Sequence, residues 1–354
     1  MKKIFFLFGL FGLAASGILA DDLPPPGGES LFLYGHPAYT TSANSAAGGP
    51  LFSAGPYSIN INPALTAGFQ SPVADFGVSV LTDTANAKAG AALHLGASYP
   101  TRWGVWTGAL RAEFFDFDSL PIGNSVAGHV GFARDVTENL YIGVGLSVGG
   151  MFNGAAKDFY AAADAGVWYR IKEVTDLPVF KNIRFGVAFQ NLGKSFNHFE
   201  AGGVELSYGA GFPGIFQPKA GVAADVLSFE KFKLGLSVDA SFPAFSNFVL
   251  NTGLQAEIAD MFYLSTGWDF NARESSNDYG MHWLYLSCGV KFQVDTSGVK
   301  ALGKDGVEQT DVKLDGLWQH LHKNIEHIAI GATVNFGARD GMPPAIEIDE
   351  IQYK

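Results

Sequence analysis

From Val73 onward, apolar side chains alternate with small or polar ones in segment after segment. In residues 140–149 every second side chain is Leu, Ile or Val, and residues 232–241 follow a similar rule. A period of two is typical of β-strands whose two faces meet different surroundings. Similar segments predict strands at 73–82, 89–99, 103–116, 125–133, 160–171, 183–190, 217–226, 247–258, 261–270, 281–294 and 326–337, with a weaker one at 203–210.

These segments have the length of membrane-spanning strands. About ten residues or slightly more match a tilted strand across a bilayer, where one face meets lipid and the other a polar interior. Trp103, Trp168 and Trp268 lie near strand ends, as expected for interfacial aromatic girdles. Because a bilayer tolerates no unpaired strand edge, the sheet must close. The sequence predicts an all-β fold, a transmembrane antiparallel β-barrel of about 14 strands; a secreted soluble barrel or sandwich is the alternative.

The connections between strands test this count, because short turns and longer loops gather at opposite ends of such a barrel. Tight turns are expected at 99–102 and 134–139, and also at 228–231 and 257–261. If 203–210 is a strand of the wall, these two pairs fall at opposite ends. Either that segment does not span, or the region around it is divided differently, so the count lies between about 12 and 14.

The chain before the alternating region has a different character. Residues 1–20 combine two lysines with an apolar run and small residues, which is the layout of a signal peptide. Residues 21–70 are rich in Gly, Pro, Ser and Ala and show no sustained period, yet they carry apolar anchors such as Leu51 and Phe52. A solvated linker would not need these anchors. We therefore expect this segment to pack inside the barrel as a plug.

Two further regions interrupt the pattern. We expect residues 295–325 to form a long loop with a short amphipathic helix over 314–325, in which Leu314, Leu317 and Trp318 share one face. The barrel is expected to cover 71–338 as a whole, with this loop inside those bounds. Residues 339–354 are expected to form a polar tail.

Composition narrows the classes of function. A net charge of −11 without clustered Lys and Arg argues against a nucleic-acid partner. Cys288 is the only cysteine, which excludes an intramolecular disulfide. The chain has no nucleophile elbow and no proper nucleotide fingerprint, so we expect no enzyme, no cofactor and no metal site. We expect His320, His322 and His327 to be solvated.

The alternation also predicts which polar side chains point into the lumen, because a charge on the lipid face costs about 2–4 kcal/mol at the midplane. We expect most of them to pair with one another. Arg111, Arg184, Lys219 and Lys233 are the candidate contacts for a carboxylate head group of a ligand. The full set is His94, Arg111, Glu113, His129, Asp164, Arg170, Arg184, Gln190, Lys219, Asp225, Lys233, Asp239, Gln255, Glu257, Asp269 and Lys291.

One short motif stands between the irregular segment and the first alternating strand. Asn62-Pro63-Ala64-Leu65 resembles the Asn-Pro-Ala hatch signature of the FadL family of outer-membrane transporters. Residues 185–193 and 217–222 are similar to strand starts in FadL-like barrels, including a spirochaetal branch and the related PorV barrels. Pro fixes φ and Asn bonds to local backbone, so the motif suits a rigid turn where plug meets wall.

The resemblance implies a 14-stranded barrel whose N-terminal hatch, with Asn62, Pro63 and Ala64, blocks the lumen. It implies passive transport of long-chain fatty acids or other hydrophobic small molecules across the outer membrane, with release through a lateral opening. We further expect a monomer surrounded by outer-membrane lipid. The alternative is a PorV-like structural or secretion-associated barrel that binds protein partners.

Overall fold

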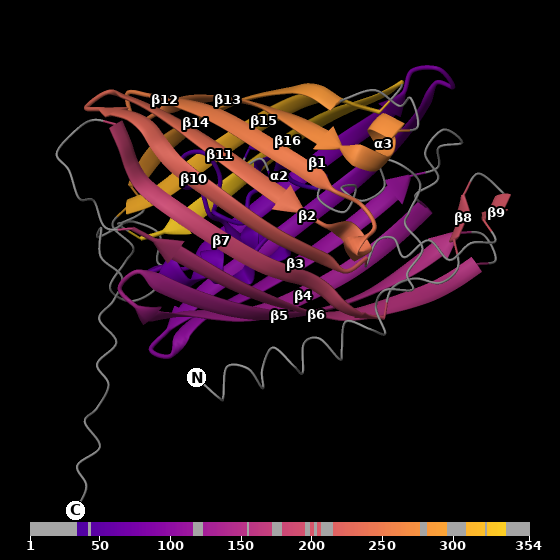
Figure 1. Ribbon diagram of the computed structural model, residues 1–354, viewed down its shortest axis with the longest axis horizontal. Coiled ribbons are helices and arrows are strands. Elements are labelled where there is room, and N and C mark those ends of the chain that lie inside the picture. Colours follow the sequence, from indigo (N-terminus) through magenta and orange to yellow (C-terminus); the bar gives the residue numbers. More distant parts are fainter. Residues whose placement is uncertain are drawn as a thin grey trace, which may run out of the picture.

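Within the described part of the chain, fourteen antiparallel strands close into a barrel, with β1 paired to β16 (Figure 1). The predicted all-β barrel and its strand number are therefore confirmed. The predicted signal peptide at 1–20 and the polar tail at 339–354 lie outside the described residues. The computed structural model describes residues 34–41, 44–115, 123–153, 156–171, 179–194, 199–201, 204–206, 215–276, 282–295, 309–322 and 324–337.

The wall consists of long strands. Its strands are β1 (Val73–Asp83), β2 (Lys88–Thr101), β3 (Gly104–Phe115), β4 (Gly123–Thr137), β5 (Leu140–Asn153), β6 (Ala156–Arg170), β7 (Val179–Lys194), β10 (Gln217–Phe229), β11 (Phe232–Ser241), β12 (Val249–Ile258), β13 (Phe262–Asn271), β14 (His282–Asp295), β15 (Gln309–His322) and β16 (Ile325–Phe336). The other elements are α2 (Ala38–Thr41), η2 (Pro56–Asn60), η3 (Pro63–Gly68), β8 (Phe199–Ala201), β9 (Val204–Leu206), η4 (Pro243–Phe245) and α3 (Ala272–Ser276).

The two faces of the wall follow the alternation in the sequence. On β5, Val144 and Leu146 point outwards and are 57% and 62% exposed, whereas Tyr141 and Ser147 are buried inside. An outer surface of this kind is costly in water but suits the hydrocarbon of a bilayer. No helix among the described residues is both long and apolar enough to cross a membrane.

Most side chains of the predicted lumen set are buried within the barrel. They include the histidines and carboxylates of β2, β4, β6 and β11, such as His94, His129, Asp164 and Asp239. The polar residues therefore gather on the inner face, where they can bond to one another and to the segment that fills the lumen. Four members that are less buried, Arg170, Lys233, Glu257 and Lys291, line a cavity at one end of the barrel together with the buried Arg184 and Gln255.

The predicted helix at 314–325 is wrong, because residues 314–322 belong to β15, which pairs with β14 and β16, and Ile325 begins β16. Leu314 and Trp318 point outwards, while Leu317 packs inside against Tyr285. A helix would have grouped these apolar side chains on one face. The two flanking strands instead satisfy the backbone groups of β15, as a wall at bilayer depth requires. The rest of the predicted loop, 296–308, lies outside the described residues.

The predicted strand at 203–210 is also wrong as a part of the wall. Its described residues form β9, which pairs with β8 in a separate two-stranded sheet. The sequence counts one strand too many here and one too few at β15, so the predicted number of strands still agrees with the structure. Because β7 is followed by β10 in the wall, the tight turns β2–β3, β4–β5, β10–β11 and β12–β13 all lie at one end. We call it the short-turn end.

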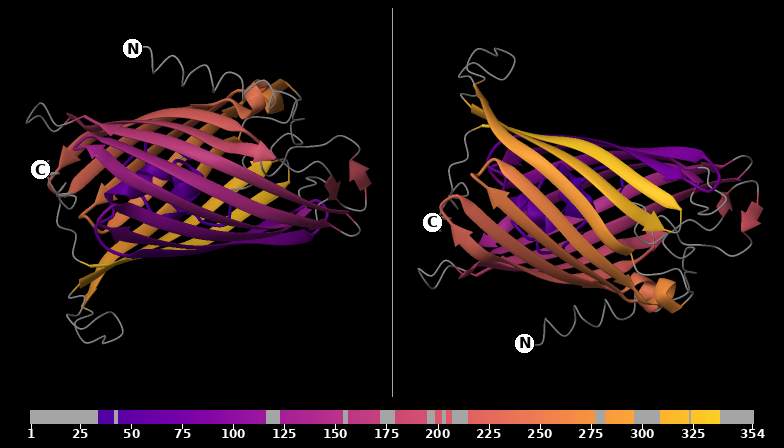
Figure 2. Two further views of the ribbon diagram at one scale, coloured as in Figure 1. Left: turned by 90° about the horizontal axis from the view of Figure 1, so that it is seen from below. Right: turned by 90° about the horizontal axis from the view of Figure 1, so that it is seen from above.

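Inside the barrel lies the N-terminal segment, which we define as residues 34–41 and 44–72 (Figure 2). Its helix η2 faces β2 and β3, and η3 faces β4, β5 and β6. Two wall glycines allow the close approach. A side chain at Gly166 would collide with Asn62, and one at Gly186 would collide with the Ala46 carbonyl. The inner face is thus shaped to receive this segment.

Candidate functional site at the N-terminal segment

The middle of the N-terminal segment is bonded to the wall through its main chain. The Ala46 N–H donates to Asp239 Oδ1 on β11 at 2.7 Å, and the Trp168 indole N–H on β6 donates to the Ala47 carbonyl at 3.2 Å. Buried main-chain groups without a partner are costly, and an irregular segment cannot pair them internally as a strand or helix does. The inward polar side chains of the wall therefore replace the missing secondary structure.

Two of the predicted head-group contacts, Arg184 and Lys219, also hold this segment. Arg184 donates to the carbonyls of Gly49 and Pro50 at 3.1 and 2.7 Å. Lys219 Nζ donates to the Asn44 carbonyl at 3.0 Å and to its side-chain oxygen at 2.6 Å. Both side chains are almost completely buried. Their charges are tolerated because they make charge-assisted hydrogen bonds with fixed acceptors.

The Asn-Pro-Ala motif lies where the segment meets β6. Asn62 Oδ1 accepts from the Ala64 N–H at 3.1 Å and caps η3, with Pro63 at the first helical position. Asn62 Nδ2 donates to the carbonyls of Ala46 and Val167, at 2.8 and 3.1 Å. One buried side chain therefore joins the helix, the middle of the segment and the wall. The three predicted residues stand at this junction, and their role as a hatch remains a prediction.

The other two predicted cations lie apart from this junction. Arg111 is buried in the lumen, where its Nη2 donates to the Tyr160 hydroxyl at 3.2 Å. Lys233 Nζ lies 2.9 Å from Glu257 and 2.6 Å from Asp260 at the short-turn end. Its hydrogen bond to Asp260, on the β12–β13 turn, holds the pKa of that carboxyl below its ordinary value. The structure therefore does not gather the four predicted cations into one site.

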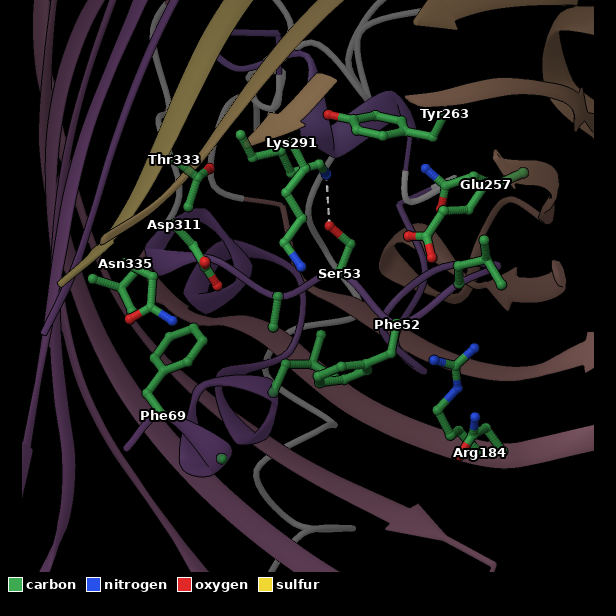
Figure 3. Close-up of a pocket in the computed structure, with 18 of the residues that line it drawn as sticks. Phe52, Ser53, Phe69, Arg184, Glu257, Tyr263, Lys291, Asp311, Thr333 and Asn335 are labelled. Atoms are coloured by element: carbon green, nitrogen blue, oxygen red, sulfur yellow. Dashed lines mark hydrogen bonds between the residues drawn. The ribbon is translucent and has the colours of Figure 1, made fainter. Parts of the chain in front are cut away.

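A cavity of about 600 Å³ lies at the short-turn end, between the N-terminal segment and the wall (Figure 3). Phe52, Leu65 and Phe69 of the segment give it apolar surface. The Phe52 ring stacks on Trp168 with 4.9 Å between ring centroids, and the Arg184 guanidinium lies 5.6 Å from the Phe52 centroid. Segment and wall together therefore build this site, which neither could form alone.

Basic side chains outnumber acidic ones around the cavity. Lys313 Nζ on β15 donates to Ser53 Oγ at 2.8 Å, which ties this cation to the N-terminal segment. The excess of positive charge favours an anionic group on a ligand over a cationic one. The basic residues are Arg170, Arg184, Lys233, Lys291 and Lys313, and the acidic ones are Glu257, Asp260 and Asp311.

Reasoning from the sequence missed Lys313 because its strand was taken for a loop and a helix. The alternation of Asp311, Lys313 and Asp315 was the available signal, since it places three charged side chains on one face. The expectation of solvated histidines is wrong for His327, which is buried with its ring 4.8 Å from that of Tyr34.

No family model and no curated protein sequence matches the chain. Among solved structures, the TodX deltaS2S3 mutant monoaromatic hydrocarbon channel has a TM-score of 0.52 at 8% identity, covering 83% of this chain and 99% of that one. The Ralstonia pickettii toluene transporter TbuX has a TM-score of 0.49 at 11% identity, covering 85% of this chain and 97% of its own. The TodX likeness concerns the fold, and it agrees with the FadL-like barrel that the sequence predicts.

Proposed function

We propose that the protein is an outer-membrane channel through which hydrophobic small molecules pass passively, and that the N-terminal segment is its hatch. The observation that carries this proposal is the filled lumen of a closed barrel. Wall residues on β6, β7, β10 and β11 bond to one short stretch, Asn44–Pro50. An open diffusion pore has no need of such a segment. In bacterial barrels the short turns face the periplasm, so the cavity belongs to the periplasmic side.

Long-chain fatty acids are the substrate that the family resemblance implies, and the cavity suits a molecule with an apolar body and an anionic head. Its volume of about 600 Å³ lies within the usual range of small-molecule sites. Phe52 and Phe69 would contact the hydrocarbon, and Lys313 or Lys291 the carboxylate, alongside the predicted Arg184 and Lys233. A neutral aromatic hydrocarbon is the rival substrate, because the TodX mutant is described as a monoaromatic hydrocarbon channel.

Uptake into liposomes tests the proposal and separates the two substrates. Vesicles that contain the protein are expected to take up labelled palmitate faster than empty vesicles, without any energy source. A palmitate rate equal to that of empty vesicles would refute the fatty-acid substrate, and the same result with toluene as well would refute the proposal. The variant Lys313→Met is expected to slow palmitate uptake but not toluene uptake, since only palmitate carries a charge. An equal loss of uptake for both substrates would show that Lys313 does not bind the head group.

The PorV-like alternative is tested by affinity purification from solubilised membranes. A channel for hydrophobic molecules is expected to yield the barrel with bound small molecules and no stoichiometric protein. A stable protein partner, together with no bound lipid by mass spectrometry, would favour the structural or secretion-associated role.

A further inference from the structure

Two tyrosines lie along the wall where β13 pairs with β14. A side chain at Gly267 on β13 would collide with Tyr285 of β14, and one at Gly289 on β14 would collide with Tyr263 of β13. Each tyrosine therefore lies over a glycine of the neighbouring strand, and close approach of another group is a common reason for glycine inside a strand. A ring placed against the wall leaves more of the lumen free than one that points across it.

The tyrosines belong to a strip of inward positions that starts at the cavity. Tyr263 lines the cavity (Figure 3), and so does Gln255 on β12. Gln255 pairs with Ser265, and Ser265 pairs with Ser287. We define the tyrosine strip as the inward residues Tyr263, Ser265, Gly267, Tyr285, Ser287 and Gly289. The strip leads from the cavity away from the short-turn end, and apart from the tyrosines it carries only short side chains.

Three hydroxyl groups of the tyrosine strip are buried without a hydrogen-bond partner. Ser265 Oγ, Ser287 Oγ and the Tyr285 hydroxyl make no hydrogen bond within the described part of the protein, and the same holds for Gln319 Oε1 on β15. All four side chains are at most 5% exposed. Buried polar atoms are nearly always paired, because hiding an unpaired one from water is costly. Water or a ligand that reached these atoms would relieve that cost.

Other parts of the wall hold the N-terminal segment by hydrogen bonds. Gln190 on β7 donates to the Asn60 carbonyl, and Trp168 on β6 donates to the Ala47 carbonyl. The side chains of the tyrosine strip make no such bond to the described residues of the segment. The helix of the segment that contacts β13 and β15 is α2, which has only four residues. A separation of α2 from this strip therefore leaves the bonds to β6 and β7 intact.

We propose that hydrophobic ligands pass between the N-terminal segment and the tyrosine strip, while the segment stays bonded to β6 and β7. This inference rests on the proposed function as a channel. Helix α2 separates from the wall to admit the ligand. The apolar body of the ligand then lies against the rings of Tyr263 and Tyr285. The uncovered hydroxyls bond to a polar group of the ligand or to water that enters with it.

Cysteine labelling tests where the passage lies. In a Cys288→Ser background, which removes the exposed native thiol, Ser287→Cys places a thiol on the strip. The probe is N-ethylmaleimide, applied to barrels in liposomes. We expect the probe to label Ser287→Cys, and palmitate or toluene to slow this labelling because the ligand occupies the passage. Labelling that neither molecule slows would overturn the proposal.

The matched control is Ser98→Cys in the same background. Ser98 is an inward serine of β2 and is 3% exposed, against 5% for Ser287. Its Oγ lies 2.8 Å from Thr107 Oγ1 and is hydrogen-bonded to it, and η2 faces its strand. Labelling is therefore expected to be several-fold faster at Ser287→Cys than at Ser98→Cys. Equal rates at the two positions would overturn the assignment of the passage to the strip.

The variant Tyr285→Phe tests the role of the unpaired hydroxyls. It keeps the ring but removes one polar group that the closed lumen hides, so α2 should separate from the strip less often. When combined with Ser287→Cys, it is expected to slow labelling by about fivefold or more. A rate as fast as without Tyr285→Phe would overturn this cause of opening.

Uptake after labelling separates the passage from the proposed function. Alkylation of Ser287→Cys is expected to abolish uptake relative to the same variant before alkylation. Uptake that survives complete alkylation would overturn the passage and leave the proposed function intact. If wild-type vesicles take up neither palmitate nor toluene, the proposed function fails and the passage with it.

Discussion

The substitution Asn62→Ala is expected to loosen the hatch by a predictable amount. It removes the cap on the Ala64 N–H, worth about 1 kcal/mol, and the bonds to the carbonyls of Ala46 and Val167, worth about 0.5–1.5 kcal/mol each. The sum is about 2–4 kcal/mol in favour of the released segment. Because about 1.4 kcal/mol is a factor of ten in an equilibrium constant, the released fraction should rise by roughly 30- to 700-fold.

The assay is ion conductance in planar bilayers, since a displaced segment opens the lumen. Wild-type barrels are expected to conduct rarely and Asn62→Ala barrels often, with the double replacement of Asn62 and Pro63 stronger still. The control is Asn271→Ala, which removes a buried asparagine bonded to Asn247 at the other end of the barrel. If Asn62→Ala conducts no more than this control, the motif is an ordinary turn and does not hold the segment in place.

Three further perturbations have defined outcomes. Gly186→Leu places a side chain against the Ala46 carbonyl, so it should raise conductance. The variant barrel should still resist unfolding on unheated gels. Loss of that resistance would mean that the substitution damages the wall instead. Desolvation by burial lowers the pKa of His36 to about 4, below its ordinary value near 6.5. The closed state should therefore lose stability as pH falls from about 6.5 towards 4, which raises the leak, and His36→Gln should reduce this rise of the leak in acid. Leu146→Arg on the lipid face should cost about 2–4 kcal/mol of barrel stability, measured by reversible urea unfolding, and an unchanged midpoint would argue against a lipid-facing β5.

Much of the wall could be predicted because each strand carries its own signal. Where small and apolar residues alternate strictly, as in β5 and β11, the inner and outer faces can be assigned from the sequence alone. β15 was lost because Leu314, Leu317 and Trp318 have the spacing of a helix face, and short apolar sets fit either period. Only its pairing with β14 and β16 decides between them, and pairing is not a local property.

The site was harder to predict than the wall. Asn62 stands out through its place before Pro63, but its partners, Ala46 and Val167, are distant in sequence and could not be named. The sequence identifies the basic residues that point inwards, but it does not identify the groups to which they bond. Arg184 and Lys219 point inwards as predicted, yet they bond to main-chain carbonyls of an irregular segment whose path no periodicity encodes. The cavity depends on that path as well.

In the proposed function, one barrel passes hydrophobic molecules while its hatch excludes ions and polar solutes. The proposed function is best tested by measuring palmitate uptake and ion conductance on membranes prepared with the same wild-type protein. We expect uptake above that of protein-free membranes together with conductance near the baseline. Large steady conductance would contradict the hatch, and no uptake beyond the protein-free rate would contradict palmitate transport.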